Sequence, residues 1–134
     1  MARTGWVIIT ETDPIARKSL AHAVRRAGHE VIECESGLQT LLEVAKWPPD
    51  VVVLDDSISD LGLGAVVDAI RSRPDGSSVG IIALLHDRGD GRIHSFEGVD
   101  VCIRKPVRAS SLVAAVRDLI EPEPEPMREV VPVS

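Results

Sequence analysis

Short apolar runs alternate along the chain with longer segments in which apolar residues recur every three or four positions. The runs are rich in valine and isoleucine and are bounded by polar or turn-forming residues, which is typical of buried strands. They predict strands at 6–10, 29–34, 51–55, 79–85 and 99–103. The longer segments between them predict helices at 13–28, 36–46, 63–73, 87–98 and 109–120.

The helix boundaries carry recognisable capping signals. Asp13 suits the N-cap of the first helix and Pro14 its first turn, while Ser36 and Gln39 form a capping box for the second helix. The helix at 87–98 is predicted to be weak, because Gly89 and Gly91 each cost helix stability. The apolar positions expected to face the core in the first two helices are Ile15, Leu20, Ala23, Val24, Ala27, Leu38, Leu41, Leu42 and Ala45.

Strict alternation of strands and helices indicates an α/β fold, with a doubly wound parallel sheet covered by helices on both faces. Residues 1–120 form the predicted domain. Residues 121–134, "EPEPEPMREVVPVS", are rich in proline and glutamate, and we expect them to be an extended, solvated tail or linker.

Composition narrows the class of protein. No apolar run approaches the roughly 20 residues that span a bilayer, and the N-terminus lacks a secretory cleavage site, so we expect a soluble cytoplasmic protein. The net charge of −6 and the scarcity of aromatic residues argue against nucleic acid as a partner of this segment. Cys34 and Cys102 have no metal-ligand spacing and are expected to be buried free thiols.

Ligand sites of such sheets lie outside the carboxyl ends of the strands. Polar residues follow those ends at Thr10–Asp13, Asp55–Ser57, His86 and Arg104–Lys105. A pair of carboxylates can hold a hard cation such as Mg²⁺, and a lysine can neutralise a phosphoryl group.

Three motifs together resemble the response-regulator receiver domain of bacterial two-component signalling. They are "DP-x-x-R" after the first strand, "PDVVVLD" in the third strand, and Lys105-Pro106 after the fifth. The resemblance covers roughly residues 5–120 and implies a flavodoxin-like sheet of order 2-1-3-4-5 with five helices. It implies that Asp55 is the phosphoacceptor, and that Lys105, followed by a cis bond to proline, is its charge partner.

The sequence departs from the family pattern at several positions. Thr12 stands where the resemblance implies a second metal-binding acid, which leaves Glu11, Asp55 and the Ser57 carbonyl as a weak Mg²⁺ site. Leu85 replaces the hydroxyl residue that contacts the phosphoryl group. Further departures are His86 for a small residue, Cys102 for the switch aromatic, Ser59 for the loop proline and Gly62-Leu63 for Asp-Gly.

Other polar residues near these strand ends have alternative interpretations. Asp13 and Asp56 are candidate substitute ligands, but an N-cap role is favoured for Asp13 and a surface or loop position for Asp56. His86 either donates to the site or merely lines a cleft. The basic residues of the first helix, which are Arg17, Lys18, Arg25 and Arg26, form either a solvated face or a docking face for a partner.

The leading hypothesis is an atypical receiver domain that acts mainly through protein–protein contacts, with phosphorylation of Asp55 weak or absent. Its expected partners are a histidine kinase, a phosphotransferase or another signalling protein, and it is no enzyme beyond self-phosphorylation and autodephosphorylation. The alternative is a conventional phosphoacceptor. A haloacid-dehalogenase-type phosphohydrolase is disfavoured because "TETDP" lacks the Asp-x-Asp nucleophile. A flavin site is disfavoured because Glu11 and Asp13 would repel a phosphate.

Overall fold

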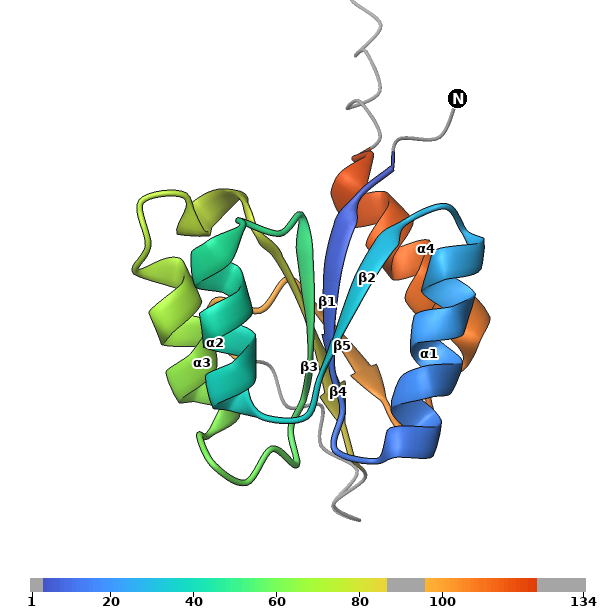
Figure 1. Ribbon diagram of the computed structural model, residues 1–134, viewed down its shortest axis with the longest axis horizontal. Helices are drawn as coiled ribbons and strands as arrows, with labels where there is room; N and C mark the ends of the chain where they lie inside the picture. Colours follow the sequence, from blue (N-terminus) through green and yellow to red (C-terminus); the bar gives the residue numbers. More distant parts are fainter. Residues whose placement is uncertain (1–3, 87–95, 123–134) are drawn as a thin grey trace, which may run out of the picture.

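The computed structural model describes residues 4–86 and 96–122. It contains a five-stranded parallel sheet of order β2-β1-β3-β4-β5, which confirms the predicted topology (Figure 1). The strands are β1 (Trp6–Thr10), β2 (Glu30–Cys34), β3 (Val51–Asp55), β4 (Gly80–Leu85) and β5 (Val101–Arg104).

Helices cover both faces of the sheet. Two lie on one face and two on the other: α1 (Pro14–Arg26) with α4 (Ala109–Ile120), and α2 (Gly37–Lys46) with α3 (Leu63–Arg71) (Figure 1). A 3₁₀ turn, Gly76–Ser78, precedes β4. The described residues thus hold four α-helices where five were predicted, and most of the segment predicted as the weak helix, 87–95, lies outside them.

The central strands form the core that positions the strand ends. Every residue of β3 and β4 is buried. Burying a valine, leucine or isoleucine side chain contributes about 1.5–3 kcal/mol to the free energy of folding. Burial therefore strongly stabilises these strands in their observed register. In that register Thr10 lies beside Leu54, and Asp55 lies beside Leu84. The carboxyl ends of β1, β3 and β4 therefore meet at one edge of the sheet.

Two predicted helix faces are wrong in part. Ile15, expected in the core, is 81% exposed, and Leu38 and Leu42 are also exposed. Ile15 lies in the first turn of α1, and α2 packs on the sheet through Thr40 and Val44 instead. Residue spacing marks an apolar face, whereas the neighbouring elements decide how much of that face is covered.

The two cysteines are free and lie on opposite edge strands, as the predicted strand order requires. Cys34 is buried, but Cys102 is exposed, so its predicted burial is wrong. Val101 and Ile103 pack toward the layer of α1 and α4, and strand alternation turns Cys102 to the other face.

None of the helices within residues 4–86 and 96–122 has the length and hydropathy needed to cross a membrane.

Candidate functional site

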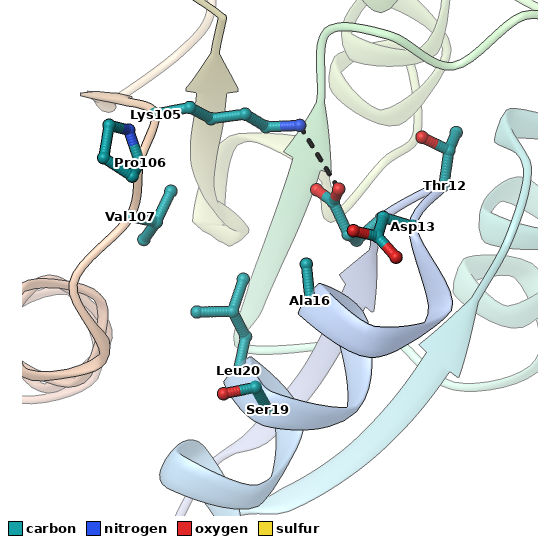
Figure 2. Close-up of a pocket in the computed structure, with 9 residues that line it drawn as sticks. Thr12, Asp13, Ala16, Ser19, Leu20, Lys105, Pro106 and Val107 are labelled. Atoms are coloured by element: carbon teal, nitrogen blue, oxygen red, sulfur yellow. Dashed lines mark hydrogen bonds and ion pairs between the residues drawn. The ribbon is translucent and has the colours of Figure 1, made fainter.

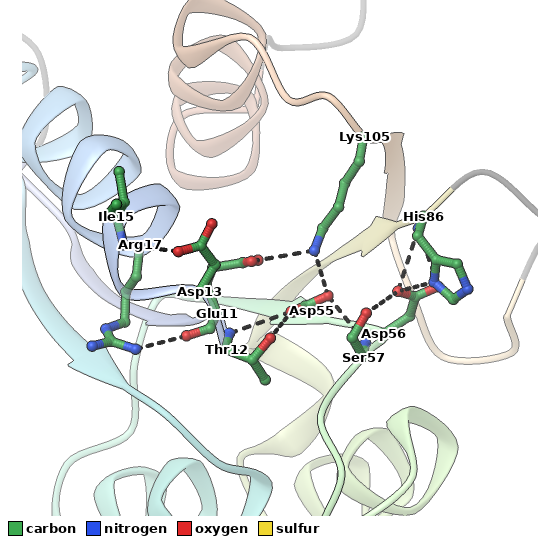
Figure 3. Close-up of polar contacts among 10 residues, drawn as sticks. All are labelled: Glu11, Thr12, Asp13, Ile15, Arg17, Asp55, Asp56, Ser57, His86 and Lys105. Carbon is green, nitrogen blue, oxygen red and sulfur yellow. Dashed lines mark hydrogen bonds and ion pairs between the residues drawn. The ribbon is translucent and has the colours of Figure 1, made fainter.

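Asp55, the last residue of β3, is fully buried at the carboxyl end of the sheet and is held by four hydrogen bonds (Figure 3). Lys105 Nζ donates to its Oδ1 over 2.8 Å, and the Ser57 backbone N–H donates to the same oxygen over 3.0 Å. The predicted direction of the Lys105 side chain is thereby confirmed, and the Lys105-Pro106 bond is cis.

Thr12 hydrogen-bonds to the other carboxylate oxygen of Asp55. Its hydroxyl donates to Asp55 Oδ2 over 3.0 Å and its backbone N–H over 3.3 Å. An acid at this position would present a second negative charge to Asp55, whereas Thr12 presents two donors. Sequence reasoning identified the missing charge at Thr12 but missed this contact, although threonine is both a donor and an acceptor.

Glu11 is the second carboxylate of the site and is 2% exposed. Its Oε1 lies 3.2 Å from Lys105 Nζ, so a single ammonium group bridges Glu11 and Asp55. Glu11 Oε2 is buried and has no hydrogen-bond partner among the described residues. A buried anionic oxygen without a partner costs free energy, and a cation bound there would relieve that cost.

Burial and charge shift the pKa values of these three groups in different directions. Burial raises the pKa of Glu11, and the neighbouring charge of Asp55 raises it further. Burial also pushes the pKa of Asp55 up, but the hydrogen bonds from Lys105, Ser57 and Thr12 outweigh it and leave the value below its usual range. Burial lowers the pKa of Lys105, but hydrogen bonding and attraction to Asp55 prevail and raise it. The site therefore favours an ionised Asp55 beside a charged Lys105.

The turn that carries Glu11 and Thr12 is fixed from α1. Asp13 accepts a hydrogen bond from the Ile15 N–H at the start of that helix, which confirms its N-cap role. Arg17 is buried rather than solvated, and its Nη1 donates to the Glu11 carbonyl over 2.9 Å. Its guanidinium also pairs with Glu33 and Glu35. One of the four basic residues assigned to a solvated or docking face is thus part of the frame of the site.

The end of β4 offers different chemistry. Leu85 is buried among apolar residues of the α2 and α3 layer and has no hydroxyl to donate. His86 Nδ1 lies 2.7 Å from Asp56 Oδ1, and the His86 N–H donates to both carboxylate oxygens over 3.3 Å (Figure 3). The Asp56 side chain is only 3% exposed, so the surface alternative for this residue is wrong, whereas its position in the loop directly after β3 agrees with the other alternative.

The structure thus brings Glu11, Asp55, Ser57 and Lys105 together, and it adds Thr12. Asp56 and His86 form a separate pair, and Cys102 is exposed on β5. The pair could have been expected from the sequence, since both residues directly follow neighbouring strands β3 and β4.

A hollow of about 400 Å³ lies between the α1 N-terminus and the segment after β5 (Figure 2). Its lining residues are Glu11, Thr12, Asp13, Ala16, Ser19, Leu20, Lys105, Pro106 and Val107. Glu11 and Lys105 therefore border an open hollow that another molecule can approach.

Comparison with known proteins relates this arrangement to a family. The model of the response regulator receiver domain matches residues 7–117. The chain is 30% identical over 113 residues to the KDP operon transcriptional regulatory protein KdpE of Escherichia coli, covering 83% of this chain and 49% of that protein. It is 29% identical over 118 residues to the phosphate regulon protein PhoB of Pseudomonas aeruginosa, covering 85% and 51%. The chain thus spans about half the length of these curated relatives.

A solved structure shares the fold. It is the receiver domain of the sensor histidine kinase PA1611 from Pseudomonas aeruginosa PAO1, described with a magnesium ion coordinated in its active site cleft. The two chains superimpose with a TM-score of 0.78 at 20% identity, covering 88% of this chain and 98% of the other. With the family model matched over residues 7–117, the chain belongs to the response regulator receiver domains of two-component signalling.

Proposed function

We propose that this receiver domain is an atypical member of its family, acting mainly through protein–protein contacts, with weak or absent Mg²⁺-dependent phosphorylation of Asp55. The observation that carries the proposal is the pair of hydrogen bonds from Thr12 to Asp55 Oδ2. They give the phosphoacceptor position neutral donors where an acidic metal ligand is expected.

The residues present fit a divalent cation only in part. Glu11 supplies a buried oxygen without a partner and Asp55 a second carboxylate. The Ser57 carbonyl would supply a third oxygen. Among the described residues there is no cluster of three acidic, histidine or cysteine side chains that could hold a metal. Because hard cations depend on anionic oxygens, affinity for Mg²⁺ should be low. A bound cation would supply charge neutralisation for phosphoryl oxygens.

The chain's own groups can still support slow phosphoryl transfer. Asp55 is the nucleophile: one of its oxygens forms the new bond to phosphorus as the bond to the phosphodonor breaks. Lys105 neutralises charge on the transferred group from its present position, 2.8 Å from Asp55. Leu85 donates no hydrogen bond, and a bond to a charged acceptor is worth about 1.5–3 kcal/mol.

The conventional phosphoacceptor is the second candidate, and two contacts favour it. Lys105 already binds Asp55, and Glu11 Oε2 is a ready anionic ligand. The conventional candidate requires a phosphodonor, such as a histidine kinase or phosphotransferase, whereas the atypical candidate requires only a signalling protein that binds this domain. The hollow beside Lys105 and the exposed Ile15 form a surface on which such a partner could dock.

The test is incubation with acetyl phosphate and Mg²⁺, followed by intact mass measurement. We expect the wild type to remain largely unmodified, and Asp55→Asn to give the same background. The double variant Thr12→Asp, Leu85→Thr should gain the mass of one phosphoryl group, because it restores a metal-binding acid and a phosphoryl donor. Nearly stoichiometric labelling of the wild type at Asp55 would establish the conventional candidate instead.

A further inference from the structure

Both tryptophans of the chain line one groove, at the end of the sheet opposite Asp55. Trp6 opens β1, and Trp47 and Pro48 follow α2; together they border a space of about 350 Å³. Trp47 is 70% exposed, a value that only Ile15 exceeds among the large apolar side chains of the described residues. An exposed tryptophan beside a proline forms an apolar surface of the kind that marks a binding site.

Trp6 adds an unpaired polar group to the groove wall. Its Nε1 is buried and has no hydrogen-bond partner in the described part of the chain. A buried donor without an acceptor costs about 1–3 kcal/mol. A carbonyl oxygen brought to Trp6, as the exposed Trp47 side chain moves aside, would remove this cost.

The last described helix ends at the same end of the sheet as this groove. The end of α4 lies at the same end of the sheet as the start of β1 and the end of α2 (Figure 1). Ile120, the last residue of α4, packs against Gly5, which directly precedes Trp6. The described chain therefore ends, at Pro122, at the same end of the sheet as the groove but on the opposite face.

The sequence of that segment has a period of three. Pro124, Met127, Val130 and Val133 are spaced three residues apart and are all apolar. Polyproline II has three residues per turn, so these four side chains would share one face of such a helix. The next face, which contains Glu125, Arg128 and Val131, is mixed. The segment thus has the pattern of an amphipathic polyproline II strand.

We propose that residues 123–134 dock in the groove of Trp6, Trp47 and Pro48 as an extended proline-containing strand of the same chain. Proline-rich strands bind aromatic-lined grooves, where the aromatic faces pack on the strand and its free backbone carbonyls accept hydrogen bonds. At about 3.1 Å per residue the segment is long enough to cross the end of the sheet beside the start of β1 and reach the other face. Because a short tether gives an effective concentration in the millimolar range, even weak intrinsic affinity suffices.

The experiment uses the full chain and its own tryptophans. The apolar-face variant Met127→Ser, Val130→Ser, Val133→Ser is compared with the mixed-face variant Glu125→Ser, Arg128→Ser, Val131→Ser. Each is made in a Trp6→Phe background, so that acrylamide quenching of fluorescence reports Trp47 alone. The indole N–H signal of Trp6 is recorded by NMR in the otherwise wild-type chain.

Docking predicts that the apolar-face variant loses protection of Trp47 from acrylamide and shifts the Trp6 indole signal, while the mixed-face variant matches the parent chain. Equal behaviour of the two variants, changed or unchanged, would overturn the proposal. So would protection that rises with protein concentration together with a dimer in sedimentation, because the occupant would then be the segment of a second copy.

Discussion

The candidate site has two halves that offer different chemistry: a charge half at the ends of β1 and β3, and a switch half at the end of β4 and within β5. The two names refer to the roles that we propose for these halves. At the ends of β1 and β3, together with Lys105 after β5, an ammonium group still bridges two buried carboxylates. At the end of β4 and within β5, Leu85 and Cys102 offer neither a hydroxyl nor an aromatic ring to the site, and His86 pairs with Asp56 instead. The groups proposed to receive charge are therefore in place, whereas a hydroxyl and an aromatic ring that could report it are not offered by Leu85 and Cys102.

The physical reason lies in the cost of removing each half. Asp55 and Glu11 are buried carboxylates whose negative charges are compensated by Lys105. Without this ion pair the folded state would be destabilised. Leu85 lies in the apolar core of the α2 and α3 layer, where burial of its side chain is favourable. We therefore expect removal of the charged groups to destabilise the fold, whereas the absence of a hydroxyl or an aromatic ring from the switch half does not.

The largest predicted effect comes from Lys105→Ala. It leaves two buried carboxylates without their cation and should lower the free energy of unfolding by about 3 kcal/mol. His86→Ala should cost only about 1 kcal/mol, because the backbone N–H of residue 86 still donates to Asp56. Urea denaturation measures both. If His86→Ala proves the more damaging variant, the comparison of the two halves is reversed.

The pH dependence of stability should also originate in the charge half. The pKa of Asp55 is lowered in the folded protein, so its contribution is present at neutral pH and is lost as the pH falls below the usual carboxyl value of about 3.9. Asp55→Asn should therefore flatten the loss of stability on acidification, measured by urea denaturation at several pH values.

Glu11→Gln is the control, and its effect has the opposite sign. The pKa of Glu11 is raised on folding, so ionised Glu11 opposes folding above that pKa. Removing its charge should raise stability at neutral pH relative to acid pH, and so steepen the acid loss. Parallel pH profiles for the wild type and both variants would mean that these pKa shifts are absent.

Thr12→Asp should increase Mg²⁺ affinity by about fivefold or more. One added charge at about 4 Å is worth roughly 4 kcal/mol at an effective dielectric constant of about 20. A quarter of that, about 1 kcal/mol, already gives roughly fivefold by the rule of 1.4 kcal/mol per factor of ten. Isothermal titration with Mg²⁺ measures the change, and Thr12→Asn is the uncharged control. Equal affinity of the two variants would show that charge at this position does not limit binding.

The smallest predicted effect concerns the thiols at the two sheet edges. Burial, assisted by the charge of Glu43, raises the pKa of Cys34 to about 11, whereas Cys102 is exposed. Since the thiolate is the reactive form, Ellman's reagent should modify Cys102 first. Cys102→Ser should abolish the fast phase with little effect on stability. A fast phase that survives in this variant would place Cys34 within reach of solvent.

Local signals made much of the fold predictable from sequence. The valine run of β3, the N-cap at Asp13 and the Lys105-Pro106 pair each depend on neighbouring residues, and the structure confirms the strands, the cap and the direction of Lys105. The order of the sheet followed from the resemblance of the motifs and is also confirmed.

What the sequence did not predict depends on contacts between distant elements. Ile15 is exposed because nothing in the described structure covers the first turn of α1, and Arg17 is buried because it binds the turn at Glu11. Thr12 was assigned only a missing charge, since its hydrogen bonds to Asp55 require the register of β1 beside β3. Burial of Asp56 likewise requires His86 from the neighbouring strand end.

The separation of the two halves can be tested most directly in the Thr12→Asp variant, which restores the charge half and keeps Leu85 and Cys102. After treatment with acetyl phosphate and Mg²⁺, the labelled fraction is measured by intact mass, and the amide NMR spectrum of the same sample is recorded. We predict that Asp55 is labelled to a greater extent than in the wild type while the amide signals of Val101–Arg104 stay in place. Movement of those β5 signals in proportion to labelling would contradict this account.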